Sequence, residues 1–540
     1  MVHYRTFVAI NWLFSVMQIN WLAVRKQRVF IAWLREDAVY LLETMMFDPD
    51  IAYQALTSRD SRFDGLFFVG VTSTGIYCRP ICPVKAPMQK NCLFFSSAEA
   101  AEKAHFRPCL RCRPELAPGF APVDSHHRIA DRLIRRIEEG LLEEQETLAE
   151  IATEFGLSER QLRRVVQQEL GVSPIELRQT RRMLLAKQLL TETSLPVTEI
   201  AYASGFNSLR RFNDVFQARY RMTPSRLRKQ SSPSPVTPLQ ESAELRLSYR
   251  PPYDWEAILD FLQQRVMKEV EWVAEGIYHR TVALGGCQGW VRVSHYPEKQ
   301  ALKVQFTTSL TPVLPALLRR LRDLFDLDAQ PQRIADQLAQ DPLLAPSLVR
   351  YPGLRVPGAF DGFELGVRAI LGQQVTVKAA TTLSSRVAQR FGAPMATPWP
   401  ELSRLSPSAE TLATATQDDI ASLGIVSARS QAILALAQAC ASGALRFNGA
   451  VNPDVVQQQL LALKGIGPWT ASYIAMRALR WPDAFPKEDI AIRNNLGGVS
   501  AKDAEVRSQV WRPWRSYAVL HIWKSLTPEK GDEAKRNKAP

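Results

Sequence analysis

The chain has 540 residues, enough for three or four domains with hydrophobic cores of their own. Its 67 Lys and Arg exceed its 54 Asp and Glu by 13, and a pI near 9.5 favours a polyanionic partner such as nucleic acid. Seven cysteines, unevenly placed, argue against a disulfide scaffold and for a reducing compartment, so we expect a cytoplasmic protein.

Residues 7–24 form an apolar stretch near the N-terminus, but Asn11, Ser15 and Gln18 interrupt it and Arg25 comes directly after it. A membrane span needs about 20 mainly apolar residues in a row, and no Ala-X-Ala cleavage site of a signal peptide is present after the stretch. We therefore expect no membrane segment. We interpret residues 1–45 as an extension upstream of an internal methionine that is the true start.

Two pairs of cysteines dominate the next segment. Three residues separate Cys78 from Cys82, 26 lie between the pairs, and two separate Cys109 from Cys112. Close pairs on separate loops can supply four thiolates to one tetrahedral Zn²⁺. Such a site is either a structural staple or a nucleophile, because the thiolate is the reactive form of cysteine. Spacing alone favours the structural zinc finger.

The residues around the cysteines favour the nucleophile. A resemblance to the N-terminal zinc domain of the Ada family of alkylation-response proteins rests on residues 72–82, Thr-Ser-Thr-Gly-Ile-Tyr-Cys-Arg-Pro-Ile-Cys, and on residues 106–112, Phe-Arg-Pro-Cys-Leu-Arg-Cys. It covers a domain at about residues 46–124 and implies one Zn²⁺ with four cysteine ligands. It also implies that Cys78 takes a methyl group irreversibly from a methylphosphotriester in DNA. Arginine can fork two donors onto phosphate oxygens, so we expect DNA contacts from Arg79, Arg107 and Arg111.

Residues 125–230 contain two helical modules of one pattern. In each, a helix with apolar residues at helical spacing is followed by a glycine turn, at Gly156 or Gly205. A capped polar helix then begins, at Ser158 or at Asn207-Ser208. This is the helix-turn-helix pattern, although either module alone also fits two helices packed in an ordinary core.

Charge separates these alternatives. Residues 205–229 hold seven Lys or Arg against the single acid Asp214, too lopsided for an ordinary solvated helix face. Two such modules in tandem resemble the AraC-type DNA-binding domain, which implies reader helices at residues 158–168 and 207–218. It also implies a promoter as target and RNA polymerase as a partner. The expected DNA-contacting residues are Arg160, Arg163, Arg164, Arg210, Arg211 and Asn213.

A serine- and proline-rich linker occupies residues 231–243, and we expect the second half of the chain to be a separate body on this tether. Residues 244–350 show alternating apolar positions, as at Leu302, Val304 and Phe306, together with a helical stretch at residues 255–268. This predicts a small α+β domain. Placed before the next segment, it resembles the N-terminal domain of AlkA-type glycosylases.

Residues 351–526 are predicted to be mostly helical, and residues 527–540 form a charged tail. Residues 463–471, Leu-Lys-Gly-Ile-Gly-Pro-Trp-Thr-Ala, suggest a helix-hairpin-helix whose glycines let backbone amides approach a DNA phosphate. A glycine turn between packed helices is an equally good interpretation of Gly-Ile-Gly alone. The segment predicts DNA contacts at Gly465, Gly467 and Thr470, and a monovalent cation at the hairpin.

Residues C-terminal to the hairpin decide between these interpretations. Asp489 lies 20 residues after Trp469, and Pro-Trp-Arg-Ser-Tyr-Ala-Val-Leu-His-Ile-Trp ends at Trp523. Together these resemble AlkA, the 3-methyladenine DNA glycosylase II group of the helix-hairpin-helix superfamily. The resemblance implies extraction of an alkylated base from the DNA stack. Trp469, Tyr473 and Trp523 would hold the cationic base, at roughly 0.5–2 kcal/mol each.

Asp489 is implied as the catalytic carboxylate, which either stabilises the positive charge on the sugar or activates water. The alternative is that Asp489 only caps a helix. Trp469 stands where strand-cleaving relatives carry a lysine, so we expect base excision without strand cleavage, and no iron–sulfur cluster because the last cysteine is Cys440. Gln374 stands where the family has an apolar leucine wedge and can still fill the gap left by a flipped base.

The sequence thus predicts a multidomain protein, mainly α with α+β parts. Its expected units are a small zinc domain, an AraC-type double helix-turn-helix, an AlkA-like α+β domain and an all-α helix-hairpin-helix glycosylase domain. We expect a monomer that binds double-stranded DNA and combines 3-methyladenine DNA glycosylase activity with methyl-activated transcription regulation. The alternatives are a regulator whose glycosylase domain is silent, and a plain glycosylase whose first half only adds DNA affinity.

Overall fold

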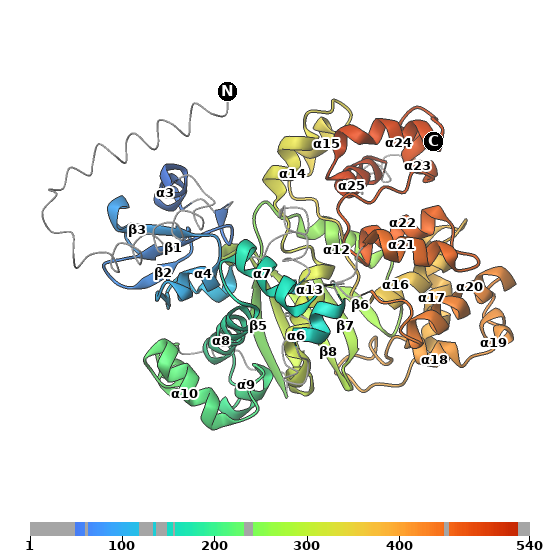
Figure 1. The fold of residues 1–540 in the computed structure, drawn as a ribbon. Helices are drawn as coiled ribbons and strands as arrows, with labels where there is room; N and C mark the ends of the chain where they lie inside the picture. The colour runs from blue at the N-terminus through green and yellow to red at the C-terminus, as the bar shows by residue number, and fades with distance from the viewer. Residues whose placement is uncertain are drawn as a thin grey trace, which may run out of the picture.

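The computed structural model describes residues 49–59, 63–117, 133–134, 136, 148–154, 157–231, 241–447 and 453–526 (Figure 1). It confirms the predicted fold class, since helices predominate and two sheets accompany them. The interpretation of residues 1–45, most of the linker and the charged tail lie outside the described residues, as does Gly156. Within the described part, no helix has the length and apolar character needed to cross a membrane.

The small zinc domain is a four-stranded sheet between two helices, at the left of Figure 1. The strand order is β3-β1-β2-β4, and β2 and β4 run parallel, with Tyr77 opposite Pro108. Because their carboxyl ends meet at one edge of the sheet, the chain brings Cys78 and Cys109 together there. The elements are α3 (Pro49–Ser58), β1 (Phe68–Val71), β2 (Ile76–Cys78), β3 (Cys92–Phe95), α4 (Ala98–Lys103), β4 (Arg107–Pro108) and the 3₁₀ turn η3 (Pro114–Leu116).

The double helix-turn-helix comes next in the chain, and its helix starts agree with the sequence signals. Ser158 caps α7 in a reciprocal capping box with Gln161, and Ser208 caps α10 by accepting from the N–H of Arg211. Gly205 has φ of 81° in the turn before α10, a conformation that favours glycine. The helices are α6 (Leu148–Glu154), α7 (Glu159–Leu170), α8 (Pro174–Glu192), α9 (Val197–Ala203), α10 (Leu209–Tyr220) and α11 (Pro224–Ser231).

The α+β domain is an antiparallel sheet in the order β5-β9-β8-β7-β6, with α12 and α13 packed on it. Apolar side chains at every second position of β9 point into the core, as sheet geometry requires, and Leu302, Val304 and Phe306 are fully buried. The elements are β5 (Ser242–Ser248), α12 (Trp255–Gln263), β6 (Glu271–Ala274), β7 (Ile277–Leu284), β8 (Cys287–Tyr296), β9 (Ala301–Thr307), η5 (Thr308–Val313) and α13 (Leu314–Leu324).

The rest of the chain is a helical body at the right of Figure 1. It has two apolar cores, and Tyr473 of α22 packs against both. The helices are α14 (Pro331–Leu338), α15 (Ala345–Arg350), α16 (Gly362–Leu371), α17 (Val377–Phe391), α18 (Ala409–Ala413), α19 (Gln417–Ala421), α20 (Ser427–Ala441), α21 (Pro453–Ala462), α22 (Pro468–Arg477), α23 (Ile490–Asn495), α24 (Ala501–Arg507) and α25 (Arg515–Ser525), with η6 (Ser508–Trp511) between the last two.

The two halves of the chain share one hydrophobic core, which corrects the expectation of a separate body on a tether. Buried Ile200 and Phe216 of the helix-turn-helix belong to the same apolar cluster as Leu245 and Leu310 of the α+β domain. The Gln188 side chain of α8 also donates to the carbonyl oxygen of Arg246 in β5, at 2.9 Å. Helices α8 and α9 therefore pack directly against the sheet domain.

Candidate functional sites

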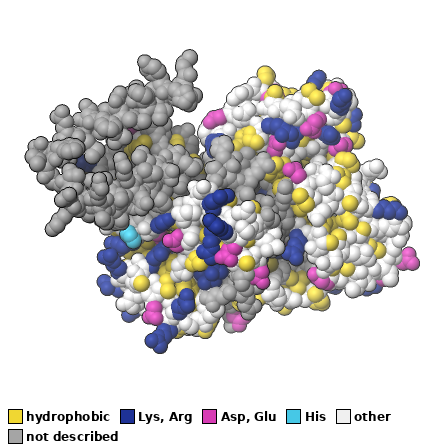
Figure 2. Space-filling view, in the orientation of Figure 1, with side chains coloured by type: hydrophobic (Ala, Val, Ile, Leu, Met, Phe, Trp, Pro, Cys, Tyr) yellow, Lys and Arg dark blue, Asp and Glu magenta, His cyan; other side chains and the backbone are white. Residues whose placement is uncertain are grey.

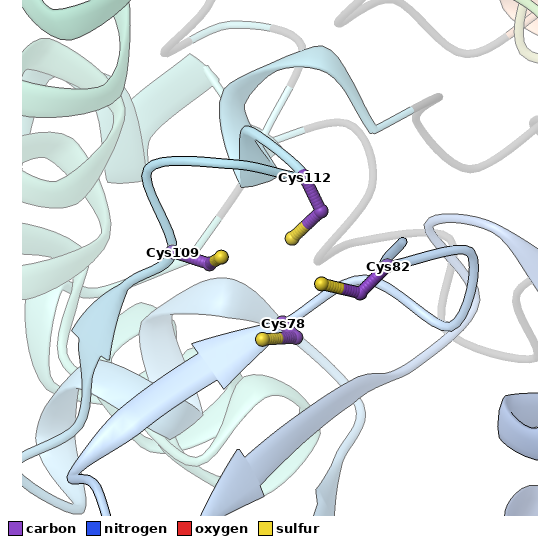
Figure 3. Close-up of side chains that lie close together, drawn as sticks. All are labelled: Cys78, Cys82, Cys109 and Cys112. Carbon is purple, nitrogen blue, oxygen red and sulfur yellow. The ribbon is translucent and has the colours of Figure 1, made fainter. Parts of the chain in front are cut away.

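The four cysteines converge as the sequence predicts (Figure 3). The Sγ atoms of Cys78, Cys82, Cys109 and Cys112 all lie within 4.8 Å of one another. A tetrahedral Zn²⁺ with Zn–S bonds of about 2.3 Å places its sulfurs about 3.8 Å apart, so the cluster needs only a small contraction to hold zinc. Three of the cysteines are buried and Cys78 alone of the four is half-exposed.

Backbone amides support the sulfurs. The N–H of Arg79 donates to Cys112 Sγ at 3.3 Å, and the N–H of Arg111 donates to Cys109 Sγ at 3.4 Å. Donors of this kind orient thiolate ligands and offset part of their negative charge. The donor set and its surroundings therefore fit a structural-type Cys₄ zinc site with one ligand open to solvent.

Arg79 lies in a different place from the one we expected. Its guanidinium is buried, donates to Asp64 Oδ1 at 2.8 Å and reaches the carbonyl oxygen of Cys112 at 3.0 Å. Burial alone would lower the pKa of Arg79, but the Asp64 carboxylate raises it above its usual value. Arg79 is thus an internal brace of the cluster in this structure. Of the other expected phosphate contacts, Arg111 is exposed and Arg107 is half-buried.

The zinc domain is joined to the helix-turn-helix by buried ion pairs along α8. Lys187 pairs with Glu115, three residues after the last cysteine of the cluster, and both side chains are 1% exposed. Burial would raise the pKa of Glu115, but Lys187 and Arg113 lower it below its usual value. Arg113 extends the network to Glu192 at 3.0 Å, and Glu192 accepts from Arg246 of β5 at 2.7 Å.

A second buried carboxylate links the zinc domain to α8 and to the second reader module. Glu102 of α4 accepts from Tyr77 at 3.0 Å and from Thr180 of α8 at 2.8 Å, and it also pairs with Arg219 of α10. Tyr77 immediately precedes Cys78 in β2. The strand that carries the half-exposed cysteine is therefore one hydrogen bond away from a carboxylate that pairs with a helix expected to read DNA.

The second site centres on Asp489. Asp489 caps α23 by accepting a hydrogen bond from the N–H of Ile492 at 3.0 Å, so the residue does have the capping role. The carboxylate also accepts from the indole N–H of Trp469 at 3.0 Å and from that of Trp523 at 3.4 Å. Two tryptophans distant in sequence thus converge on one carboxylate, which a helix cap does not require.

Aromatic rings form the wall beside this carboxylate. The rings of Trp469 and Tyr473 are stacked, with centroids 5.2 Å apart and planes 10° apart, and Tyr473 meets Trp523 at 6.4 Å. Arg477 donates to the Tyr473 hydroxyl at 2.7 Å. Burial would raise the pKa of Tyr473, but Arg477 and Arg265 lower it below its usual value.

The glycines of the predicted hairpin lie between α21 and α22. Gly465 has φ of 89°, and a Cβ there would lie 2.8 Å from Ala432 Cβ, so only glycine fits. Gly467 is the N-cap residue of α22, and no side chain caps this helix N-terminus. The Thr470 side chain is buried, and its hydroxyl accepts from Gln373 at 3.1 Å. Thr470 can therefore offer only its backbone amide to a phosphate.

Comparison with known proteins assigns each part of this architecture. Four family models match in chain order: "Metal binding domain of Ada" over residues 51–115, "Helix-turn-helix domain" over 129–230, "AlkA N-terminal domain" over 244–361 and "HhH-GPD superfamily base excision DNA repair protein" over 367–516. A Mycobacterium tuberculosis (strain CDC 1551 / Oshkosh) protein named "Probable bifunctional transcriptional activator/DNA repair enzyme AlkA" is 36% identical over 485 residues, which cover 89% of this chain and 97% of that protein. The chain belongs to the bifunctional AlkA family.

Two further relatives each match one part of this family member. "DNA-3-methyladenine glycosylase 2" of Escherichia coli (strain K12) is 36% identical over 277 residues, covering 51% of this chain and 95% of its own. "Bifunctional transcriptional activator/DNA repair enzyme AdaA" of Bacillus subtilis (strain 168) is 31% identical over 184 residues, covering 34% of this chain and 83% of its own. The resemblances to the Ada and AlkA families are thereby confirmed.

The expected reader helices present their cations to solvent. Figure 2 shows Lys and Arg side chains gathered over α7 and over the α9–α10 region on the same face of this AlkA-family chain. Arg163 is paired with Glu159 one helical turn away, at 2.6 Å, and Asn213 is half-buried. The exposed members of the predicted set are Arg160, Arg163, Arg164, Arg210 and Arg211.

Some residues of the sites were not foreseen from sequence. No sequence pattern assigns a role to Gln373. Its side-chain amide donates to the carbonyl oxygen of Gly465 at 2.9 Å and connects the loop after α16 to the hairpin. Arg477 carries a weak signal, since it lies four residues after Tyr473 and so on the same helix face. Asp64 carries none, because its partner Arg79 is 15 residues away on a separate loop.

Proposed function

We propose that this chain hydrolyses the N-glycosidic bond of alkylated bases in double-stranded DNA and also regulates transcription when Cys78 receives a methyl group from a DNA methylphosphotriester. The observation that carries the first activity is the Asp489 carboxylate held by the indole N–H groups of Trp469 and Trp523. The half-exposed sulfur of Cys78 in a buried Cys₄ cluster carries the second.

In base excision, the alkylated nucleotide leaves the stack and its cationic base lies against the aromatic wall of Trp469, Tyr473 and Trp523. The bond between sugar C1′ and the base nitrogen breaks, and the base leaves with the bonding electrons. Asp489 stabilises the positive charge that develops on the sugar, and water forms the new C1′–O bond and loses a proton. We propose a monofunctional enzyme, because Trp469 occupies the hairpin position of the strand-cleaving lysine.

The hairpin and the loop after α16 would hold the DNA. The backbone amides at Gly465, Gly467 and Thr470 face a phosphate at the uncapped start of α22, where the helix dipole also favours an anion. The same hairpin is the proposed place for a monovalent cation. Gln374 is exposed at the tip of its loop with φ of 52°, a placement that suits a side chain inserted into the gap left by the flipped base.

In the methyl transfer, the Cys78 thiolate attacks the methyl carbon of the phosphotriester. The S–C bond forms, the C–O bond breaks, and a phosphodiester anion leaves. Cys78, Cys82, Cys109 and Cys112 would hold a Zn²⁺ ion, which would keep Cys78 deprotonated and nucleophilic. The transfer makes the cluster less negative by one unit, so a DNA phosphate near Arg111 and Arg107 meets less repulsion. Affinity gained in this way falls as salt rises.

The helix-turn-helix pair would supply sequence choice. We propose that Arg160, Arg164, Arg210 and Arg211 approach DNA with α7 and α10 in successive major grooves. Promoter binding would act through RNA polymerase, and the chain would work as a monomer. The hydrogen bonds from Tyr77 and Thr180 and the ion pair with Arg219, all to Glu102, connect the strand that carries Cys78 to α8 and to the second reader helix α10.

The test of the regulatory half is mass spectrometry after exposure to duplex DNA with one methylphosphotriester. One methyl group should appear on Cys78 in the wild-type chain and in Cys92→Ser, and none in Cys78→Ser. Promoter affinity should rise roughly tenfold on methylation, about 1.4 kcal/mol. A methyl group on another residue, or unchanged promoter affinity, would contradict the proposal.

A further inference from the structure

A basic groove lies beside the loop that carries Gln374, and its lining includes none of the residues around Asp489. It has a volume of about 580 Å³ and runs between the segment after α12 and the outer face of α17. Among the described residues that line it are three cations and no carboxylate. The lining residues are Gln264, Lys268, Val377, Lys378, Thr381, Thr382, Ser385, Arg386 and Gln389.

The three cations are exposed and come from the two walls of the groove. Lys378 and Arg386 are eight residues apart on α17, about 12 Å along the helix axis, and both line the groove. Lys268 faces them from the other wall, which is fixed by the bond from its own N–H to Ser385 Oγ at 3.0 Å. None of the three has a carboxylate partner in the described part of the chain. Arg386 is aligned by a bond to Leu423 O at 2.9 Å.

The position of the groove relative to the hairpin decides what can lie in it. Gln373, just before Gln374, bonds to the hairpin at Gly465 O. The residues just after Gln374 lead instead through Thr376 into α17 and the groove. In Figure 1 α17 accordingly runs beside α16, below α21 and α22. Gln374 therefore stands between two surfaces suited to phosphate, the hairpin amides on one side and the groove on the other.

We propose that this groove binds phosphates of the DNA strand opposite the lesion. The inference rests on the proposed glycosylase function, in which the hairpin holds the lesion strand and Gln374 enters the duplex. A duplex opened at that point offers its second backbone on the far side of Gln374. Successive phosphates of one strand lie about 3.4 Å apart along the duplex axis, so cations spread over about 12 Å of α17 can meet more than one of them.

The test is base release by the full-length chain from a short duplex with one N-alkylated purine and no promoter sequence. In K268Q/K378Q, kcat/KM should fall roughly tenfold at physiological salt while kcat at saturation stays unchanged. The slope of log kcat/KM against log salt concentration should become less negative by about two, because each lost phosphate contact contributes close to one unit of slope. The matched control is K299Q/K303Q, on β9 and the turn before it and outside the groove lining.

The strand assignment is tested with the same variants. Single-stranded alkylated DNA should be processed equally by wild type and K268Q/K378Q. Neutral methylphosphonates placed in the opposite strand should slow the wild type and leave K268Q/K378Q unaffected. An equal loss on single-stranded DNA, or an equal loss in the control pair, would overturn the proposal.

A binding assay separates failure of the groove from failure of the proposed function. If the wild-type chain releases no base, the glycosylase proposal fails. Anisotropy with a duplex that carries a tetrahydrofuran abasic site then still decides on the groove. Opposite-strand methylphosphonates should weaken binding of the wild type several-fold more than binding of K268Q/K378Q, and equal weakening of both would refute the groove.

Discussion

The buried pair of Lys187 and Glu115 should set how firmly the zinc domain is held on α8. The informative changes are Lys187→Met and Glu115→Gln, alone and together. Both side chains are 1% exposed, so removal of either partner leaves a charge in a site that water does not reach. Removing one member of a buried ion pair costs about 3–5 kcal/mol in general.

The structure predicts unequal costs for the two single changes. After Lys187→Met, Glu115 keeps Arg113 at 3.0 Å, so the loss should be near or below the lower end, about 2–3 kcal/mol. After Glu115→Gln, Lys187 has no carboxylate and must lose its proton. Deprotonation of an ordinary lysine at pH 7 costs about 4.6 kcal/mol, so the decrease in the free energy of unfolding should not exceed about that value. The double variant should resemble Lys187→Met.

The assay is urea unfolding of the zinc-loaded chain, monitored by zinc release and by tryptophan fluorescence. Zinc release should shift to lower urea concentration in both single variants, and the shift should be larger in Glu115→Gln than in Lys187→Met. Base release in the absence of urea should be unchanged in both. Equal shifts in the two single variants, or losses below about 1 kcal/mol, would refute the reasoning. The pair would then behave as a solvated one, and the zinc domain would not be anchored through it.

The two sites and the core lead to three further expected outcomes. Cys109→Ala should lose the bound zinc in metal analysis and destabilise the zinc domain, and retention of one equivalent of zinc would exclude the Cys₄ site. Burial lowers the pKa of His521 to about 4. The folded state therefore favours neutral His521. The resulting contribution to the free energy of unfolding is complete above pH 6.5. It should be lost as pH falls from about 6.5 to 4, and the loss should be at most about 3 kcal/mol. Between pH 6.5 and 4 the urea midpoint should fall less in His521→Asn than in the wild type, and identical pH profiles of the two proteins would contradict this role of His521. Gln374→Ala should slow single-turnover base release about tenfold and Gln374→Leu should not, because an apolar side chain can also fill the unstacked gap; equal rates in the two variants would remove the side chain from base extrusion.

The sequence allowed the domains and both sites to be predicted where the signal is local. Cysteine spacing, capped helices at Ser158 and Ser208, and the glycines around Ile466 are short-range patterns with a direct structural meaning. Trp523 is distant from Trp469 in sequence and could be added only through the family resemblance. Spacing by itself does not bring two such residues to one carboxylate.

The features that could not be predicted depend on pairings between distant segments. Arg79 is a surface arginine by its local sequence, and only the fold places Asp64 beside it. The serine- and proline-rich composition of residues 231–243 says nothing of the shared core formed by Ile200 and Leu310. Nor does any local pattern indicate that Glu102 accepts hydrogen bonds from residues of two domains.

The central claim is that one chain carries both a DNA glycosylase and a methyl-activated regulator. The role of the Asp489 carboxylate tests this claim most directly. The decisive measurement is release of 3-methyladenine from duplex DNA by the wild-type chain and by Asp489→Asn side by side, with Asp503→Asn as the control on the neighbouring helix α24. The wild type and the control should release the base without breaking the strand, while Asp489→Asn binds the same duplex and releases none above background. Release by Asp489→Asn at the wild-type rate, or none by the wild type, would contradict the account.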